Sequence, residues 1–108
     1  MAKQIIESSG NIFADLGMAN PEEHMLKAGL VSKLAEVIRA MNLSQTAAAK
    51  VTGISQPDLS RVLRGQFRDM SAERIIRALI RLGSDVDIDV SQRGEPVGQR
   101  IHLEAVAA

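Results

Sequence analysis

Apolar and polar residues repeat along this chain with two different periods. Up to about residue 83, apolar residues recur at intervals of three or four, which is the spacing of one face of an α-helix. Between Asp85 and Val90, β-branched residues alternate with aspartates, which is the period of a β-strand with one apolar face. The pattern therefore predicts a helical part followed by a strand region.

The longest periodic segment predicts a helix over about residues 21–41. Asn20 is placed to cap it, and Pro21 suits its first position, where no amide donor is required. Glu22 and Glu23 put negative charge beside the positive end of the helix dipole. The residues expected on its inward face are Leu26, Leu30, Leu34, Val37, Ile38 and Met41.

Residues 43–65 predict two short helices that meet at a sharp angle. Ser44 can cap the first helix, and Gly53 can end it, because glycine adopts a left-handed backbone without a steric penalty. Ser55 can cap the second helix at once, with Pro57 in its first turn.

The spacing within these two helices is that of a DNA-binding helix-turn-helix. Counting Gln45 as the first position, the small residue Ala49 is fifth and Gly53 is ninth, which permits a close crossing and a tight turn. The run resembles the phage-repressor-like family, which includes the lambda and 434 repressors and the xenobiotic-response-element (XRE) regulators. The resemblance implies a mainly α, four- to five-helix, lambda-repressor-like DNA-binding domain whose recognition helix covers about residues 55–64.

The helical domain is expected to cover residues 11–83. Residues 1–10 show no sustained period and are expected to form a flexible arm. The domain would begin with a helical turn at residues 11–17, which contributes Phe13 to the core. The alternative for Phe13 is a patch that docks a partner. The domain would end with a helix between a capping Ser71 and Gly83.

Residues 84–108 are expected to form a C-terminal strand or hairpin, with a turn at Gly94–Gly98 and a second strand from Ile101 to Ala105. One helix-turn-helix reads only a few base pairs, so we expect a homodimer on a palindromic operator. We expect this extension to supply the dimer surface, because an open strand edge has unpaired hydrogen-bonding groups.

The chain offers no set of residues for catalysis. It has no cysteine, and no Ser, His and carboxylate are spaced as nucleophile and base. His24 has no second ligand at metal spacing, so we expect a surface histidine. The alternating Asp85, Asp87 and Asp89 lack the glycine turn and later glutamate of a calcium loop. We therefore expect neither an enzyme nor a metal or cofactor site.

Composition agrees with a folded, non-membrane protein. The hydrophobic fraction is 45%, and no apolar run approaches the roughly 18 residues that span a bilayer. The N-terminus lacks a secretory pattern, so we expect the protein in the cytoplasm.

The charges are unevenly distributed, although the net charge is zero. Residues 31–82 hold nine basic and four acidic side chains, and the two flanking segments are both acidic. A positive middle fits a phosphate partner, with an ordinary solvated surface as the alternative. The same two readings apply to the outer stripe of the last helix, Arg74, Arg77 and Arg81, where Glu73 is spaced to pair with Arg77.

If the domain binds DNA as the resemblance implies, the start of the recognition helix enters the major groove, where base edges can be distinguished. The positions expected to read bases are Ser55, Gln56, Pro57, Ser60 and Arg61. Contacts to the phosphate backbone are expected from Gln45, Lys50, Arg64 and Arg68. Pro57 offers no donor, in contrast to many relatives. The alternative is that Gln56 and Arg61 are exposed residues on a helix kept for packing.

A second resemblance lies N-terminal to the helix-turn-helix. The block at residues 11–17, continuing through 20–23 to 26–28, is similar to the start of HigA-type antitoxins. That resemblance implies an autorepressor that also binds a small basic toxin, an RNA-cleaving enzyme of the RelE type. Two alternatives stay open: a stand-alone XRE-type transcription factor without a toxin, and a protein-interaction module that no longer reads DNA.

Overall fold

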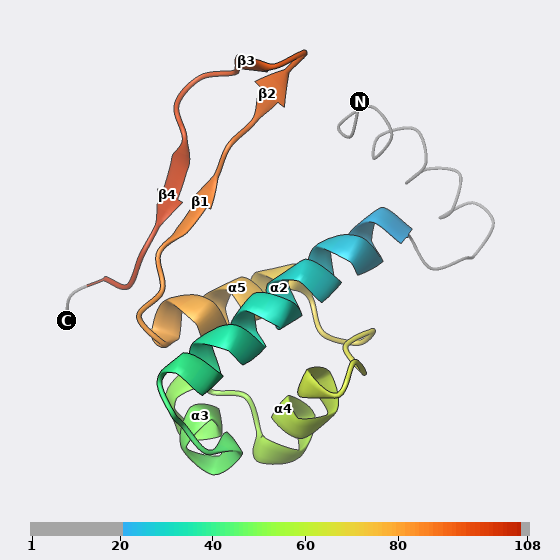
Figure 1. The fold of residues 1–108 in the computed structure, drawn as a ribbon, viewed down its shortest axis with the longest axis vertical. Coiled ribbons are helices and arrows are strands. Elements are labelled where there is room, and N and C mark those ends of the chain that lie inside the picture. Colours follow the sequence, from blue (N-terminus) through green and yellow to red (C-terminus); the bar gives the residue numbers. More distant parts are fainter. Residues whose placement is uncertain (1–20, 107–108) are drawn as a thin grey trace.

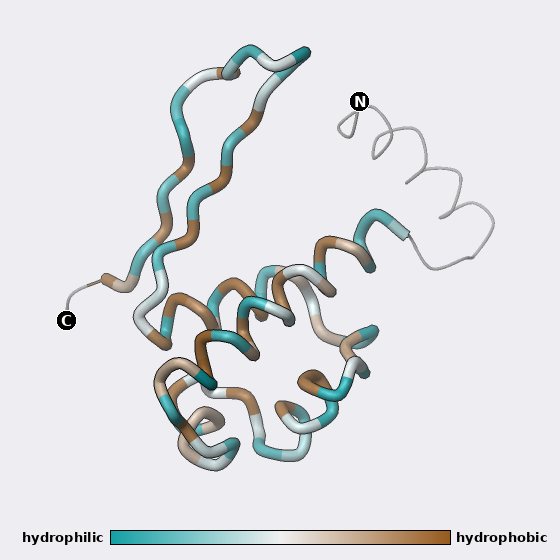
Figure 2. The backbone as a smooth tube through the Cα atoms, in the orientation of Figure 1, coloured by the Kyte–Doolittle hydropathy of each residue, from teal (hydrophilic) through white to brown (hydrophobic). Residues whose placement is uncertain are grey.

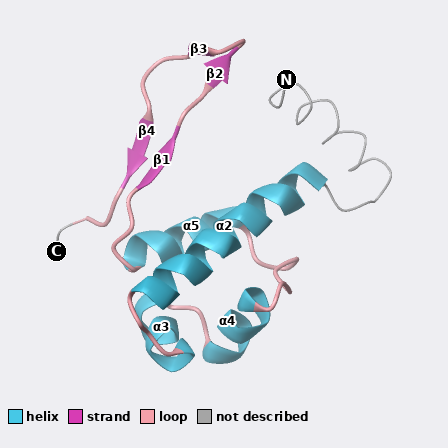
Figure 3. Ribbon diagram, viewed as in Figure 1, coloured by secondary structure: helices cyan, strands magenta, loops and turns pink. Residues whose placement is uncertain are grey.

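The computed structural model describes residues 21–106. Its helices are α2 (Pro21–Ala40), α3 (Gln45–Thr52), α4 (Gln56–Leu63) and α5 (Ala72–Arg81), and its strands are β1 (Val86–Ile88), β2 (Ser91–Gln92), β3 (Glu95–Pro96) and β4 (Ile101–Leu103) (Figures 1 and 3). This confirms the mainly helical fold class with a C-terminal hairpin. The helical turn expected at 11–17, the arm expected at 1–10 and the Asn20 cap lie outside the described residues.

The helices enclose one hydrophobic core. Helix α2 packs against α5 and α4, and α3 packs against both α4 and α5. Apolar side chains from three helices and from the turn between α3 and α4 meet in the centre, where they are fully buried: Leu34, Ile54, Leu59 and Ile75. Phe67 and Met70 close the core from the loop before α5, as apolar contacts of the kind expected there.

The inward face of α2 differs from the face that we expected. Leu34 and Ile38 are buried, but Leu26 and Met41 are exposed, and Lys27 takes an inward position instead. The Lys27 amino group donates to the backbone oxygen of Arg68 at 3.0 Å. Its alkyl stem can therefore lie along the core while its charge keeps a partner. The apolar Val31 is buried as well, so the inward face of α2 follows Lys27, Val31, Leu34 and Ile38 and is rotated from the expected one.

The strands form a narrow antiparallel hairpin. Strand β1 pairs with β4, and β2 pairs with β3. The tight turn falls at Arg93 and Gly94, where φ is 53° and 84°, and not across Gly94–Gly98 as expected. Positive φ at both central residues is the geometry of a two-residue hairpin turn that follows the natural twist of the strands.

The apolar side of the first strand meets the helices only at its base. Val86, at the base of the hairpin, packs against the helical core, but Ile88 and Val90 remain exposed. Figure 2 shows apolar and polar residues alternating along a hairpin that extends away from the helices. The alternation therefore predicts the strand correctly, but no described residue covers the apolar side of the strand beyond Val86.

Candidate nucleic-acid interface

Local hydrogen bonds fix the start of each short helix. The Ser44 hydroxyl accepts from the Ala47 amide at 3.1 Å, and the Ser55 hydroxyl accepts from the Asp58 amide at 3.3 Å. Between the two helices, Gly53 has a φ of 77°, in the left-handed region. These are the caps and the turn that the sequence predicts.

A cation from α5 holds the turn between α3 and α4. Arg81 donates from Nη1 to the backbone oxygen of Thr52 at 3.1 Å. A Cβ atom on Gly53 would collide with this guanidinium. Gly53 is therefore favoured by its left-handed backbone, and a side chain there would also have to displace the end of Arg81 from Thr52. Arg81 is not simply part of a solvated stripe, whereas Arg77 makes the expected surface pair with Glu73.

Thr52 is a buried polar residue at the same joint that the sequence did not single out. Its hydroxyl donates to the Ala48 backbone oxygen at 2.8 Å and accepts from the Ile54 amide at 3.3 Å. It thereby satisfies an amide donor where the chain leaves α3. A threonine directly before the turn glycine is the signal that could have identified it.

The recognition helix α4 separates its core side from an outer side. Leu59 and Val62 are buried against the other helices. Successive residues are rotated by about 100° around a helix axis, so the side opposite this pair carries residues one or two positions away. The structure places the expected base-reading set there and at the adjacent cap, all of them exposed apart from the half-exposed Ser60: Ser55, Gln56, Pro57, Ser60 and Arg61.

The first residues of α3 and α4 are joined by their side chains. Gln56 donates from Nε2 to Oε1 of Gln45 at 3.2 Å. This bond brings an expected backbone-contacting residue to an expected base-reading residue at the N-terminal end of the recognition helix. It leaves one amide hydrogen and the amide oxygen of Gln56 available for another partner.

Arg61 has a partner on its own helix. Its Nη2 forms an ion pair with Oδ1 of Asp58, and both side chains are largely exposed. The hydrogen bond to the Ser55 side chain, with a further contribution from Arg61, lowers the pKa of Asp58 below its ordinary value. Asp58 is therefore ionised at neutral pH and holds Arg61 at the edge of the outer side.

The expected phosphate contacts surround the outer side of α4. Lys50 lies on α3, Arg64 caps the C-terminus of α4, and Arg68 lies in the following loop. All three are exposed, and none makes an ion pair with another side chain of residues 21–106. These cations are free to meet an anionic backbone. Arg68 is positioned through its own backbone oxygen, which Lys27 holds.

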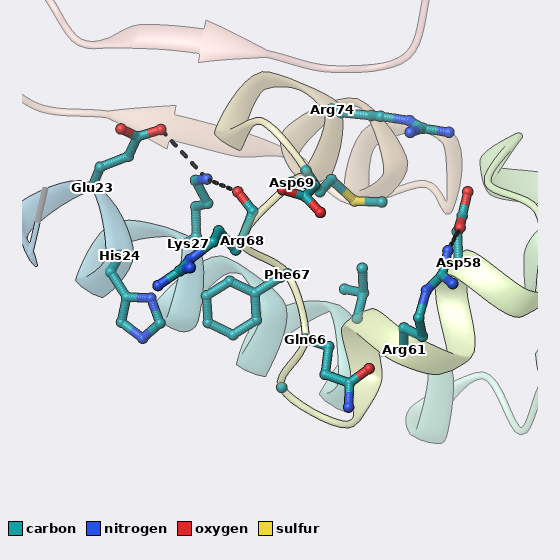
Figure 4. A pocket seen from close by; sticks show the side chains of 13 residues that line it. Glu23, His24, Lys27, Asp58, Arg61, Gln66, Phe67, Arg68, Asp69 and Arg74 are labelled. Carbon is teal, nitrogen blue, oxygen red and sulfur yellow. Dashed lines mark hydrogen bonds and ion pairs between the residues drawn. The ribbon is translucent and has the colours of Figure 1, made fainter. Parts of the chain in front are cut away.

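A hollow beside α4 extends toward α2, and both basic and acidic side chains line it, the carboxylates being Glu23, Asp58 and Asp69 (Figure 4). Arg61, Arg68 and Arg74 line it together with His24 and Phe67. The imidazole of His24 stacks on the Phe67 ring with centroids 5.0 Å apart. His24 is therefore an exposed histidine as expected, but with an aromatic contact that the sequence did not predict.

Comparisons with known proteins agree with this arrangement. A family profile of a helix-turn-helix domain matches residues 12–91. The chain is also similar to a solved structure described as belonging to the XRE family of transcriptional regulators, with 33% sequence identity and a TM-score of 0.65. That similarity covers 83% of this chain and 100% of the other chain. No curated protein matches the sequence.

The matched segment contains both helices of the motif and all nine of the candidate DNA-contacting residues. Among the described residues, no helix has the length and apolar character needed to cross a membrane. The family match, the sequence identity and the observed fold together show that the chain belongs to the helix-turn-helix family of XRE-type DNA-binding transcriptional regulators.

Proposed function

We propose that this regulator is a repressor that binds a palindromic operator as a homodimer and reads it with the outer side of α4. The Gln45–Gln56 hydrogen bond carries this proposal. It couples a residue suited to the DNA backbone to one suited to a base edge, at the end of α4 that a helix-turn-helix inserts into the major groove.

Gln56 has the chemistry to read adenine. Its free oxygen can accept from the adenine amino group while its remaining amide hydrogen donates to the adjacent ring nitrogen. The bond to Gln45 would hold the side chain in the plane needed for both contacts. Such a bidentate pair is worth about 1–3 kcal/mol of discrimination against a wrong base.

Arg61 has the chemistry to read guanine, through its oxygen and ring nitrogen acceptors. In the free protein it is paired with Asp58, so binding would exchange one exposed ion pair for two bonds to a base. Ser60 can bond several bases, and Pro57 can only touch an apolar group such as the thymine methyl. Gln56 and Arg61 would then provide most of the sequence discrimination.

Phosphate contacts would position the domain on the duplex. The residues that would make them are exposed and lie on α3, at the C-terminal cap of α4 and in the loop that follows it: Gln45, Lys50, Arg64 and Arg68. Contacts of this kind provide affinity without sequence information, and they make binding salt-dependent because counterions are released.

The test is a binding titration on the DNA just upstream of the gene, beside scrambled DNA, at two salt concentrations. We expect specific binding at least about a thousandfold tighter than binding to scrambled DNA. The double variant Gln56→Ala, Arg61→Ala should lose that preference but keep salt-dependent binding. Arg77→Ala is the matched control, because Arg77 is an exposed surface cation on α5. Equal binding of the wild type to both DNAs would contradict the proposal and favour an interaction module that no longer reads DNA.

We further propose that the protein is an autorepressing antitoxin that neutralises a small basic RelE-type toxin. Two observations support this role: the resemblance of residues 11–28 to HigA-type antitoxins, and the acidic balance of the segments that flank the DNA-binding region. Operator and toxin together would place the protein in the cytoplasm. Co-expression with the product of the neighbouring reading frame tests this role. If that product is a small basic protein that stops growth, we expect this chain to restore growth. A neighbour without toxicity would favour the stand-alone regulator.

A further inference from the structure

The hairpin has two chemically different faces. In the register of β1 with β4, Val86 lies opposite Leu103 and Ile88 opposite Ile101, whereas Asp87 lies opposite His102. Residues directly opposite each other in an antiparallel pair project to the same side. One side of this ladder is therefore entirely apolar, and the other side is charged.

The charged face is satisfied within the hairpin itself. Arg100 pairs with Asp89 at 2.8 Å, and Nδ1 of His102 lies 2.6 Å from Oδ1 of Asp87. These cross-strand pairs match each of the two aspartates with a basic group. Asp85 and Glu104 lie beside His102 at the base of the same face, so this face is charged along its whole length and is not an apolar surface.

The apolar face is left largely exposed to solvent. Ile88 and Ile101 are 38% and 50% exposed, and the next apolar residues toward the tip, Val90 and Val97, are 40% and 46% exposed. A backbone bond of 2.8 Å from the Val97 amide to the Val90 oxygen holds that second pair together. An isolated two-stranded hairpin is marginally stable in water, so this face would gain from a cover.

We propose that the apolar face of the hairpin, formed by the residue pairs Val86–Leu103, Ile88–Ile101 and Val90–Val97, packs against the same face of a second copy of this chain. The inference rests on the dimeric DNA binding of the proposed function, and it names the surface that makes the dimer. It also replaces the strand edge, which the sequence suggested, with a face.

The size of the face suits one more copy. The exposed parts of these side chains form a patch on the order of 300–400 Å², the size of patch that often marks an interaction site on a monomer. Apolar atoms make up a little over half of a typical interface, so this core belongs to an interface of roughly 600–700 Å² per copy. A standard interface buries about 800 Å² per partner. The expected dimer is therefore of moderate strength, and a two-fold operator would strengthen it.

The charges favour a second copy over a basic protein. A two-fold contact places the same patch on both sides, and a face without charge is complementary to itself. A basic partner would need carboxylates at the contact, but Asp87 and Asp89 project to the opposite face and are already paired. This distinguishes the hairpin from the surface expected for a toxin.

Cysteine cross-linking tests which face meets the partner, because the natural chain has no cysteine. Ile88→Cys, Val90→Cys, Val97→Cys and Ile101→Cys are made one at a time on the full chain. Asp89→Cys and Arg100→Cys, on the charged face, are the matched controls. After mild oxidation we expect a covalent dimer from at least one apolar-face variant and from neither control. Cross-linking from the controls alone, or equally from both faces, would overturn the proposal.

Light scattering over a concentration series provides the second test. The variant Ile88→Thr, Ile101→Thr keeps β-branched side chains and so keeps the strands, and Asp89→Thr, Arg100→Thr is its counterpart on the charged face. We expect the first variant to weaken dimerisation by at least about tenfold and the second to leave it unchanged. Circular dichroism should show unchanged helices in both. A monomeric wild type, or equal dimerisation of all three proteins, would refute the inference.

DNA binding separates this inference from the proposed function. If the wild type dimerises through the apolar face but shows no operator preference, base reading by α4 is refuted and the hairpin interface is not. If the wild type prefers its operator but the variant Ile88→Thr, Ile101→Thr still dimerises as well as the wild type, the hairpin interface is refuted and base reading by α4 is not.

Discussion

The helical domain and the hairpin bury their apolar residues in opposite ways. In the helices, Leu34, Leu59 and Ile75 are completely buried, and the core is closed by the domain's own side chains. In the hairpin, no described residue is buried, and Ile88 and Ile101 remain half open to solvent. The comparison teaches that an amphipathic pattern predicts an apolar face but not whether the same chain covers it.

The two regions therefore leave different kinds of surface exposed. The helical domain buries its core with its own side chains, and the outer side of α4 remains exposed. The hairpin is complete only on its charged face, so its apolar face is available for assembly.

Truncating one core residue in each region should give very different losses of stability. Leu59 is fully buried, so Leu59→Ala should lower the free energy of unfolding by about 2–5 kcal/mol. Ile101 is 50% exposed, so Ile101→Ala should cost about 1 kcal/mol or less in dilute protein. Denaturant unfolding monitored by the helical signal measures both. Equal losses would mean that the hairpin belongs to the same cooperative core.

Substituting one glycine with positive φ in each region should separate two contributions to the loss of stability: a steric clash of the new side chain and a left-handed backbone. Gly53→Ala must adopt a φ of 77° and also displace Arg81, and we expect a loss of about 2–3 kcal/mol together with weaker DNA binding. A Cβ atom at Gly94 would meet open space at a φ of 84°, so Gly94→Ala should lose only the about 1–2 kcal/mol of stability that a left-handed backbone costs. We expect this variant to keep DNA binding. Thermal unfolding and an operator titration compare them. Retained DNA binding in Gly53→Ala would argue against Arg81 as a restraint on the turn.

The smallest effect concerns pH and should appear only in the hairpin. The hydrogen bond to Asp87, and then the one to Glu104, raises the pKa of His102 above its ordinary value. Because the folded-state pKa is the higher one, the protonated histidine stabilises the hairpin fully below the unfolded-state pKa of about 6.5. This stabilisation is lost as the pH rises through the folded-state pKa. Amide exchange across β1 and β4 should accelerate accordingly, and His102→Gln should abolish that pH step. A step that persists in this variant would exclude His102 as its origin.

Local chemistry explains what could be predicted from the sequence. Ser44, Ser55 and Gly53 act on backbone groups within a few residues, so the helix boundaries follow from the residues themselves. The outer positions of α4 follow in the same way, since the buried Leu59 and Val62 define its core side.

Contacts between distant segments explain what could not be predicted. Lys27 can be buried because the backbone oxygen of Arg68, forty-one positions away, accepts a hydrogen bond from its amino group. Arg81 reaches Thr52 across twenty-nine positions. No periodicity within one helix contains such information. The Gln45–Gln56 bond was also missed, since it depends on the angle between two helices.

The outer side of α4 has a consequence for how such proteins diversify. Gln56 is exposed and Ser60 half-exposed on α4, and beyond Val86 the apolar pairs of the hairpin lie outside the helical core. If α4 reads the operator and the hairpin makes the dimer, as proposed, one copy left by a gene duplication could drift to a new DNA target through changes in α4, while altered hairpin residues would stop it from mixing with its sibling. Two short stretches of surface are enough to insulate one regulatory circuit from the other.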